Sequence, residues 1–207
     1  MAGGQVSGEA EKNGLFVIGL LGGIGSGKST VARIIEARGG GRIDCDDIVH
    51  ELYKIESVIE SVAREFGDQV RGPDGIDRST LGKVALASEE AIKRLMSIVH
   101  PLVVRAVQGG LSELEKVDAR FAVIEAAFLI EAGLDKFCDT IWFIDVDAEE
   151  CRKRVVSDRG WSEEEIIKRD QYQMTPEEKR AHADAVIENR SDLAALEAQV
   201  DKLLDRN

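Results

Sequence analysis

Residues 22–29 read Gly22-Gly23-Ile24-Gly25-Ser26-Gly27-Lys28-Ser29 and match the pattern G-x-x-x-x-G-K-[ST]. An apolar run, residues 15–21, comes before them, and residues 30–38, which are typical of a helix, follow. A strand, a glycine-rich loop and a helix in this order form a phosphate-binding P-loop. The glycines let successive backbone N–H groups turn around an oxyanion, and the helix adds the positive end of its dipole.

Two side chains of this loop have expected tasks in nucleotide chemistry. Lys28 reaches the β- and γ-phosphates, and the Ser29 hydroxyl ligates Mg²⁺. We therefore predict ATP and Mg²⁺ as cofactors, with Lys28 as a catalytic residue and Ser29 as a metal ligand. The predicted nucleotide-binding residues are Gly23, Ile24, Gly25, Ser26, Gly27, Lys28, Ser29 and Thr30.

The composition restricts the partners and the compartment. A net charge of −12 argues against a nucleic acid partner, because neutralising phosphates needs clustered Lys and Arg. No apolar run reaches membrane-spanning length, so we expect no membrane contact. The three cysteines, Cys45, Cys138 and Cys151, form no C-x-x-C pair and indicate a reduced, cytoplasmic protein. We expect a monomer or a weak homo-oligomer.

The length of the chain, 207 residues with 43% hydrophobic content, suffices for one sizeable core. Residues 1–13 are polar and Gly-rich and lack the apolar segment of a signal peptide. We predict that they form a disordered tail and that residues 14–207 form a single domain.

Apolar, strand-like runs alternate with helical periodicity along this domain, which predicts an α/β fold with a parallel sheet flanked by helices. The expected strands are residues 16–21, 41–45, 121–125, 140–146 and 185–188. Between the second and third strands lies a mostly helical insertion, with helices expected at residues 56–66, 78–86, 89–99 and 101–116. A second helical block, residues 148–183, is rich in Arg, Lys and Glu. Helices inserted at the carboxyl end of a parallel sheet usually close over a ligand.

Two carboxylates follow the second strand in the segment Ile43-Asp44-Cys45-Asp46-Asp47. In an extended segment Asp44 and Asp46 face one side, and Cys45 and Asp47 face the other. A carboxylate pair beside a P-loop suits the acceptance of a hydroxyl proton and the binding of Mg²⁺ or its waters. The alternative is an N-cap for a helix over residues 47–53, with Asp47 as the residue of purely structural role.

Several motifs together resemble the dephospho-CoA kinase family in order and spacing, over residues 15–204. They are Gly19-Leu20-Leu21 with the P-loop through Thr30, then Ile43-Asp44-Cys45-Asp46, then His100-Pro101, and then Ala183-Asp184-Ala185-Val186-Ile187-Glu188-Asn189. The resemblance implies phosphorylation of the ribose 3′-hydroxyl of dephospho-CoA by ATP, the last step of coenzyme A synthesis. It also implies a P-loop kinase core, a CoA-binding helical subdomain at about residues 55–117, and a lid at about residues 151–183.

Phosphoryl transfer needs a phosphate cradle, Mg²⁺, a base that orients the acceptor hydroxyl, and mobile cations. The resemblance places the base, which also binds the substrate, at Asp46, with Asp44 assisting through water or metal. It also makes His100 a substrate-binding residue, although proline after a histidine is equally a common helix start. Arg154 and Arg159 are expected to swing onto the transferring phosphoryl group, although charged helices usually form solvated faces.

Three other classes of protein share the P-loop. A GTPase switch carries D-x-x-G and N-K-x-D segments, and neither occurs in this chain. A non-catalytic nucleotide-binding module leaves the pair of aspartates without a task. A nucleoside or nucleotide monophosphate kinase obeys the same physics and differs mainly in the acceptor pocket, and it is therefore the second prediction.

Overall fold

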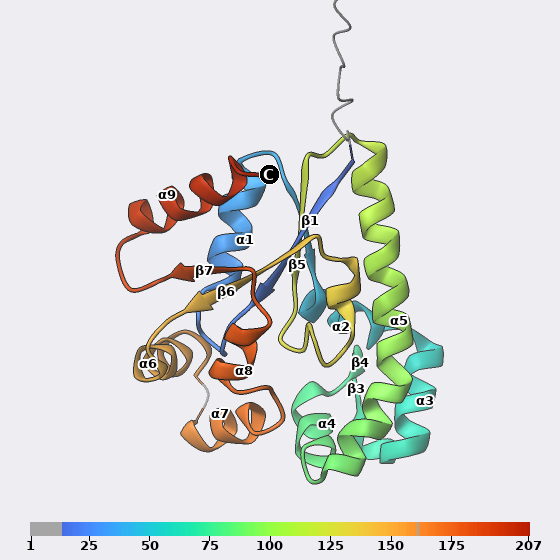
Figure 1. Cartoon of the computed structure of the whole chain (residues 1–207). Coiled ribbons are helices and arrows are strands. Elements are labelled where there is room, and N and C mark those ends of the chain that lie inside the picture. Colours follow the sequence, from blue (N-terminus) through green and yellow to red (C-terminus); the bar gives the residue numbers. More distant parts are fainter. Residues whose placement is uncertain (1–13, 161) are drawn as a thin grey trace, which may run out of the picture.

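A five-stranded sheet with the strand order β2-β5-β1-β6-β7 lies at the centre of the structure (Figure 1). The computed structural model describes residues 14–160 and 162–207, so the expected tail lies outside the described residues. The strands are β1 (Phe16–Leu21), β2 (Gly41–Asp44), β5 (Phe121–Glu125), β6 (Thr140–Asp145) and β7 (Ala185–Glu188). Each neighbouring pair is parallel. The predicted α/β fold with a parallel sheet is therefore confirmed.

Helices cover both faces of this sheet, because its strands are apolar on both sides. On β1, Ile18 and Leu20 pack into the core formed with α1 (Lys28–Ala37) and α9 (Leu193–Leu204). Val17 and Leu21, on the opposite side, pack into the larger core formed with α5 (Glu89–Lys116). Figure 1 shows α1 and α9 on one side of the sheet and α5 on the other. Within the described residues, every helix is too short or too polar to cross a membrane.

The insertion between β2 and β5 extends beyond the carboxyl ends of the strands (Figure 1). It contains α2 (Cys45–Leu52), α3 (Glu56–Phe66), the short turn η1 (Asp68–Val70), the hairpin of β3 (Arg71–Gly72) and β4 (Gly75–Ile76), α4 (Arg78–Ala85) and α5. The hairpin was not predicted, since two-residue strands leave almost no periodic signal.

Helix α5 corrects one prediction, because it runs without a break where two helices were expected. Pro101 lies inside it and removes one backbone N–H donor. The buried residues Val99, Val103 and Val107 nevertheless lie on one side of the helix before and after the proline. Their packing against the core stabilises the continuous helix more than the proline destabilises it.

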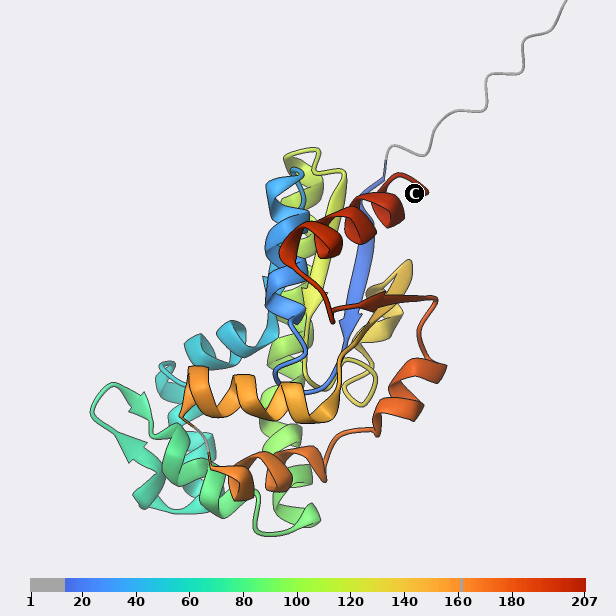
Figure 2. The same ribbon diagram turned by 90° about the vertical axis from the view of Figure 1, so that its left-hand side faces the viewer.

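The other helical block also lies beyond the carboxyl ends of the strands, as Figure 2 shows for α6 (Ala148–Arg159) and α7 (Glu163–Asp170). The short turn η2 (Leu134–Phe137) precedes β6, and α8 (Pro176–Ala181) leads into β7. The insertion and the α6–α7 pair thus flank the edge of the sheet at which β1 enters the P-loop (Figures 1 and 2).

Candidate active site

The P-loop joins β1 to α1, and its glycines are needed for its shape. Gly27 has a φ of 98°, and a Cβ there would collide with the Asn189 side-chain nitrogen. Asn189 follows β7, and its Nδ2 donates to the Ser26 carbonyl at 2.8 Å. At Gly25 a Cβ would lie 2.7 Å from the backbone oxygen of Cys151 on α6. Only glycine therefore permits both neighbours to approach the loop this closely.

A cavity of about 260 Å³ opens over this loop. It is lined by Ile24, Gly25, Ser26, Gly27, Lys28, Ser29, Thr30, Arg33, Asp46, Glu125, Ala126, Ala127, Arg154 and Val155. All the predicted nucleotide-binding residues except Gly23 are among them. The cavity joins the P-loop to α1, to the start of α2, to the end of β5 and to α6.

The Lys28 ammonium folds back onto the loop. Its Nζ donates to the carbonyl oxygens of Gly22 and Gly23, each at 3.0 Å. Gly23 thus belongs to the site through its backbone oxygen. These two carbonyls are neutral, so an anionic phosphate in the cavity would bind the ammonium more strongly than they do.

Ser29 belongs to a network of charged groups at the ends of β2 and β5. Its hydroxyl donates to Glu125 Oε1 at 2.5 Å. The other carboxylate oxygen of Glu125 accepts from Arg42 Nη2 at 2.7 Å, and the same Arg42 nitrogen donates to Asp44 Oδ2 at 2.5 Å. Glu125 is only 8% exposed, so this pairing compensates a buried charge.

Asp44 and Asp46 do not share one side of an extended strand, which corrects the sequence interpretation. Helix α2 already begins at Cys45, because the Asp44 carboxylate caps it by accepting from the backbone N–H groups of Asp46 (2.9 Å) and Asp47 (3.3 Å). The cap is therefore Asp44 and not Asp47. Asp46 lies in the first turn, is exposed, and lines the cavity, whereas Asp44 does not line it.

Of the two predicted arginines, Arg154 reaches the cavity from α6. Its Nε lies 3.4 Å from Glu150 Oε1, a loose helical pair that leaves the guanidinium at the cavity wall. Arg159 is the last residue of α6, and its side chain lies outside the described part of the chain.

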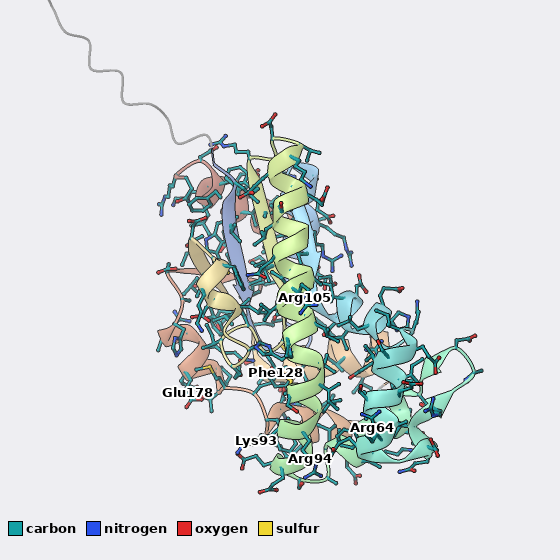
Figure 3. The ribbon with its side chains drawn as sticks, turned by 90° about the vertical axis from the view of Figure 1, so that its right-hand side faces the viewer. Arg64, Lys93, Arg94, Arg105, Phe128 and Glu178 are labelled. Carbon is teal, nitrogen blue, oxygen red and sulfur yellow. The ribbon has the colours of Figure 1, made fainter. Side chains whose placement is uncertain are left out.

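His100 lies on α5, in the insertion, and does not line the cavity over the P-loop. It is half-buried, and its Nδ1 is buried without a hydrogen-bond partner among the described residues. Figure 3 shows three cations near this region, with Lys93 and Arg94 at one end of α5 and Arg105 near its middle. Lys93 pairs with Glu89 and Arg94 pairs with Glu65, each at 2.6 Å.

Sequence reasoning assigned no role in the site to four residues: Arg33, Arg42, Glu125 and Asn189. Arg33 had a readable signal, since it lies one helical turn after Ser29 and so shares its side of α1. Glu125 had a weaker one, an acidic residue that ends an otherwise apolar strand. Arg42 and Asn189 act through contacts that only the folded chain creates.

Comparison with known proteins shows the family of this chain. The sequence model of the dephospho-CoA kinase family matches residues 16–195. The dephospho-CoA kinase of Geobacter sulfurreducens is 39% identical over 189 residues, which cover 90% of this chain and 96% of that protein.

Solved structures show the same similarity. A crystal structure of a Thermus thermophilus protein has a TM-score of 0.78 and 31% identity, with 93% of this chain and 98% of that one covered. The dephospho-CoA kinase from Campylobacter jejuni has a TM-score of 0.67 and 25% identity, with 92% and 96% covered. With a family match over most of its length and a P-loop cavity that holds an exposed aspartate, this chain belongs to the dephospho-CoA kinase family.

Proposed function

We propose that this chain transfers the γ-phosphoryl group of ATP to the ribose 3′-hydroxyl of dephospho-CoA in the cavity over the P-loop. This is the activity that membership of the family indicates, the last step of coenzyme A synthesis. The main support for placing the reaction in this cavity is that Lys28, Asp46 and Arg154 all line it, although they come from three different helices. A phosphate-binding cation, a base and a mobile cation meet there.

Each of these groups has a task in the transfer. Lys28 leaves the Gly22 and Gly23 carbonyls and binds the phosphates of ATP. The exposed Asp46 carboxylate accepts a hydrogen bond from the acceptor hydroxyl and takes its proton as the new O–P bond forms, while the bond between the γ-phosphorus and the bridging oxygen breaks and ADP leaves. Arg154 neutralises charge on the transferring group. Asp44 has a positioning role, since it holds the start of α2 and thereby the Asp46 backbone.

The residues around Ser29 fit Mg²⁺, which prefers hard oxygen ligands and usually retains several waters. The Ser29 hydroxyl and the Glu125 carboxylate supply such oxygens beside the phosphate loop. Within residues 14–160 and 162–207, no cluster of three or more His, Cys, Asp and Glu side chains could hold a metal by itself. This supports a magnesium ion held jointly by Ser29 and ATP, where it would offset phosphate charge.

The acceptor itself provides the test of this function. Incubation with Mg²⁺-ATP and dephospho-CoA should place the phosphate on the 3′-hydroxyl, located by NMR of the product. A 3′-deoxy analogue of dephospho-CoA should bind but accept no phosphate, because only the attacking oxygen is missing. Adenosine and AMP should be poor acceptors. Preferred phosphorylation of AMP, or label at another position of dephospho-CoA, would contradict the proposal.

We propose that the lid, residues 151–183, closes when ATP and acceptor are both bound. We also propose that the insertion, residues 55–117, contacts the acceptor, in part through His100. The lid range and the insertion already touch in this structure, since the hydroxyl of Tyr172 donates to the carbonyl of Leu86 at 3.2 Å. Segments that close over ligands belong to the less stable parts of a fold.

The three cysteines are free, which supports a reducing compartment, the cytoplasm.

Lid closure predicts a change in hydrogen exchange. Backbone amides of residues 155–169 should exchange more slowly with both ligands than with either one, because only the ternary complex closes the lid. Mass spectrometry of peptic peptides measures this, with α9, on the α1 face of the sheet, as the internal control. Equal exchange of residues 155–169 with and without saturating ligands would mean that the lid is a fixed part of the structure.

A further inference from the structure

Lys179 on α8 is a buried lysine to which the phosphoryl transfer gives no task. Its side chain is 3% exposed, and lysine is almost never fully buried without a partner. Its Nζ donates to Gln173 Oε1 at 2.7 Å and to the backbone oxygen of Gly22, the first residue of the P-loop, at 3.4 Å. Burial lowers the pKa of Lys179, and the carboxylates of Glu131 and Asp170 act in the opposite direction.

The local sequence fixes this lysine in place. Thr175 caps α8 in a reciprocal capping box with Glu178, and Pro176 occupies the first turn. Just before the helix, the backbone N–H of Met174 donates to Glu131 Oε1 at 2.9 Å. The start of α8 is thus held by the capping box within the helix and by the bond to Glu131 before it. The Lys179 side chain leaves a helix whose start is capped and is bonded to Glu131, and these contacts place its ammonium beside the P-loop.

Two ammonium groups therefore share the Gly22 carbonyl. Lys28 donates to it at 3.0 Å and Lys179 at 3.4 Å, so Lys28 is the closer donor in this structure. Gly22 is buried, and a buried carbonyl that loses its donor is costly. When Lys28 moves to bound phosphates, Lys179 is the donor already within reach of this oxygen.

We propose that Lys179 is a positioning residue of the P-loop, which takes over the Gly22 carbonyl when Lys28 turns to the phosphates of a bound nucleotide. The inference rests on the proposed function, since it assumes that the P-loop holds ATP. The contact keeps the first peptide group of the loop in place while its other N–H groups bind phosphate. Lys179 itself touches neither substrate nor the reacting atoms.

The variant Lys179→Met tests this inference, because it keeps an unbranched side chain and removes the ammonium. The affinities for ATP and for ADP should both fall by about tenfold, the weight of one hydrogen bond to a charged group. Dephospho-CoA affinity should not change. Without nucleotide the melting temperature should not fall, since the cost of burying a charge disappears as well. Calorimetric titration and thermal melting measure these quantities.

Two further variants complete the design. Lys153→Met removes an exposed lysine of α6, paired with Glu149 at 2.9 Å, and should leave nucleotide affinity unchanged. Gln173→Leu removes the acceptor that holds the Lys179 ammonium and should weaken ATP and ADP binding in the same direction, by less. The double variant Gln173→Leu with Lys179→Met should bind nucleotide no more weakly than Lys179→Met alone, because both changes act through one ammonium.

The outcomes separate this inference from simpler ones. Unchanged nucleotide affinity in folded Lys179→Met would show that the lysine only joins α8 to the core. A loss confined to ATP would also overturn it, because that pattern means direct contact with the γ-phosphate. If Lys179→Met fails to fold, Gln173→Leu decides by the same two criteria. Failure of the wild-type chain to bind ATP would instead count against the proposed function.

Discussion

The variant Lys28→Ala should lose most of its turnover, by about 10² to 10³-fold, while the fold stays intact. The ammonium offsets charge on the transferring phosphoryl group, and removing one preorganised donor of this kind costs about that factor. Its hydrogen bonds include those to the carbonyls of Gly22 and Gly23, and the Gly22 carbonyl keeps Lys179 as a donor when Lys28 is replaced. The melting temperature without nucleotide should therefore change little.

Steady-state kinetics with dephospho-CoA and thermal melting check this prediction. Lys153→Ala is the matched control, since it removes an exposed lysine of the neighbouring helix α6 that pairs with Glu149 and does not line the cavity. Near-normal turnover of Lys28→Ala would remove the P-loop from the mechanism. A large drop in melting temperature would mean that the lysine has a structural role.

The second large effect is expected at Asp46. Asp46→Asn keeps the size of the side chain and part of its hydrogen bonding but removes the basic carboxylate. Turnover should fall by about 10² to 10⁴-fold, the usual range for general acid–base catalysis. ATP affinity should change little, because Asp46 acts on the acceptor. The free energy of unfolding should also change little, since Asp46 is exposed and its backbone N–H, which bonds to Asp44, is retained.

The chain offers a close control for this variant in the next residue. Asp47 is also exposed, and its backbone N–H also bonds to Asp44, but it does not line the cavity over the P-loop. Asp47→Asn should therefore retain near wild-type turnover. Equal activity of both variants with dephospho-CoA would mean that the base is another residue.

The P-loop and the central strands were predictable because their signals are local. Residues 121–125, for example, form a short run that is apolar apart from Glu125 and buried on both faces, and the predicted and observed boundaries of β5 agree. The segment Asp44-Cys45-Asp46-Asp47 shows where local reasoning ends. Asp44 both ends β2 and caps α2, with Oδ1 accepting from the α2 backbone and Oδ2 accepting from Arg42, and the sequence pattern alone does not reveal this double role.

Other features of the site depend on contacts between distant parts of the chain. Asn189 reaches the Ser26 carbonyl across 163 residues, and Lys179 reaches Gly22 across 157. Hydrophobic periodicity carries no information on contacts between such distant residues. The sequence therefore showed that Asn189 belongs to a motif but did not show what its side chain contacts. The break expected at Pro101 was wrong for a related reason, since core packing outweighed the local preference of proline.

The continuity of α5 through Pro101 has a mechanical consequence. At 1.5 Å per residue, its 28 residues form a strut of about 42 Å whose one end packs on the sheet and whose other end carries the insertion. Because the helix has no break between its two ends, a displacement at one end is passed on to the other. We therefore expect the insertion to move little relative to the P-loop, and adjustment to ligands to fall mainly to the short helices α6 and α7 on the opposite wall.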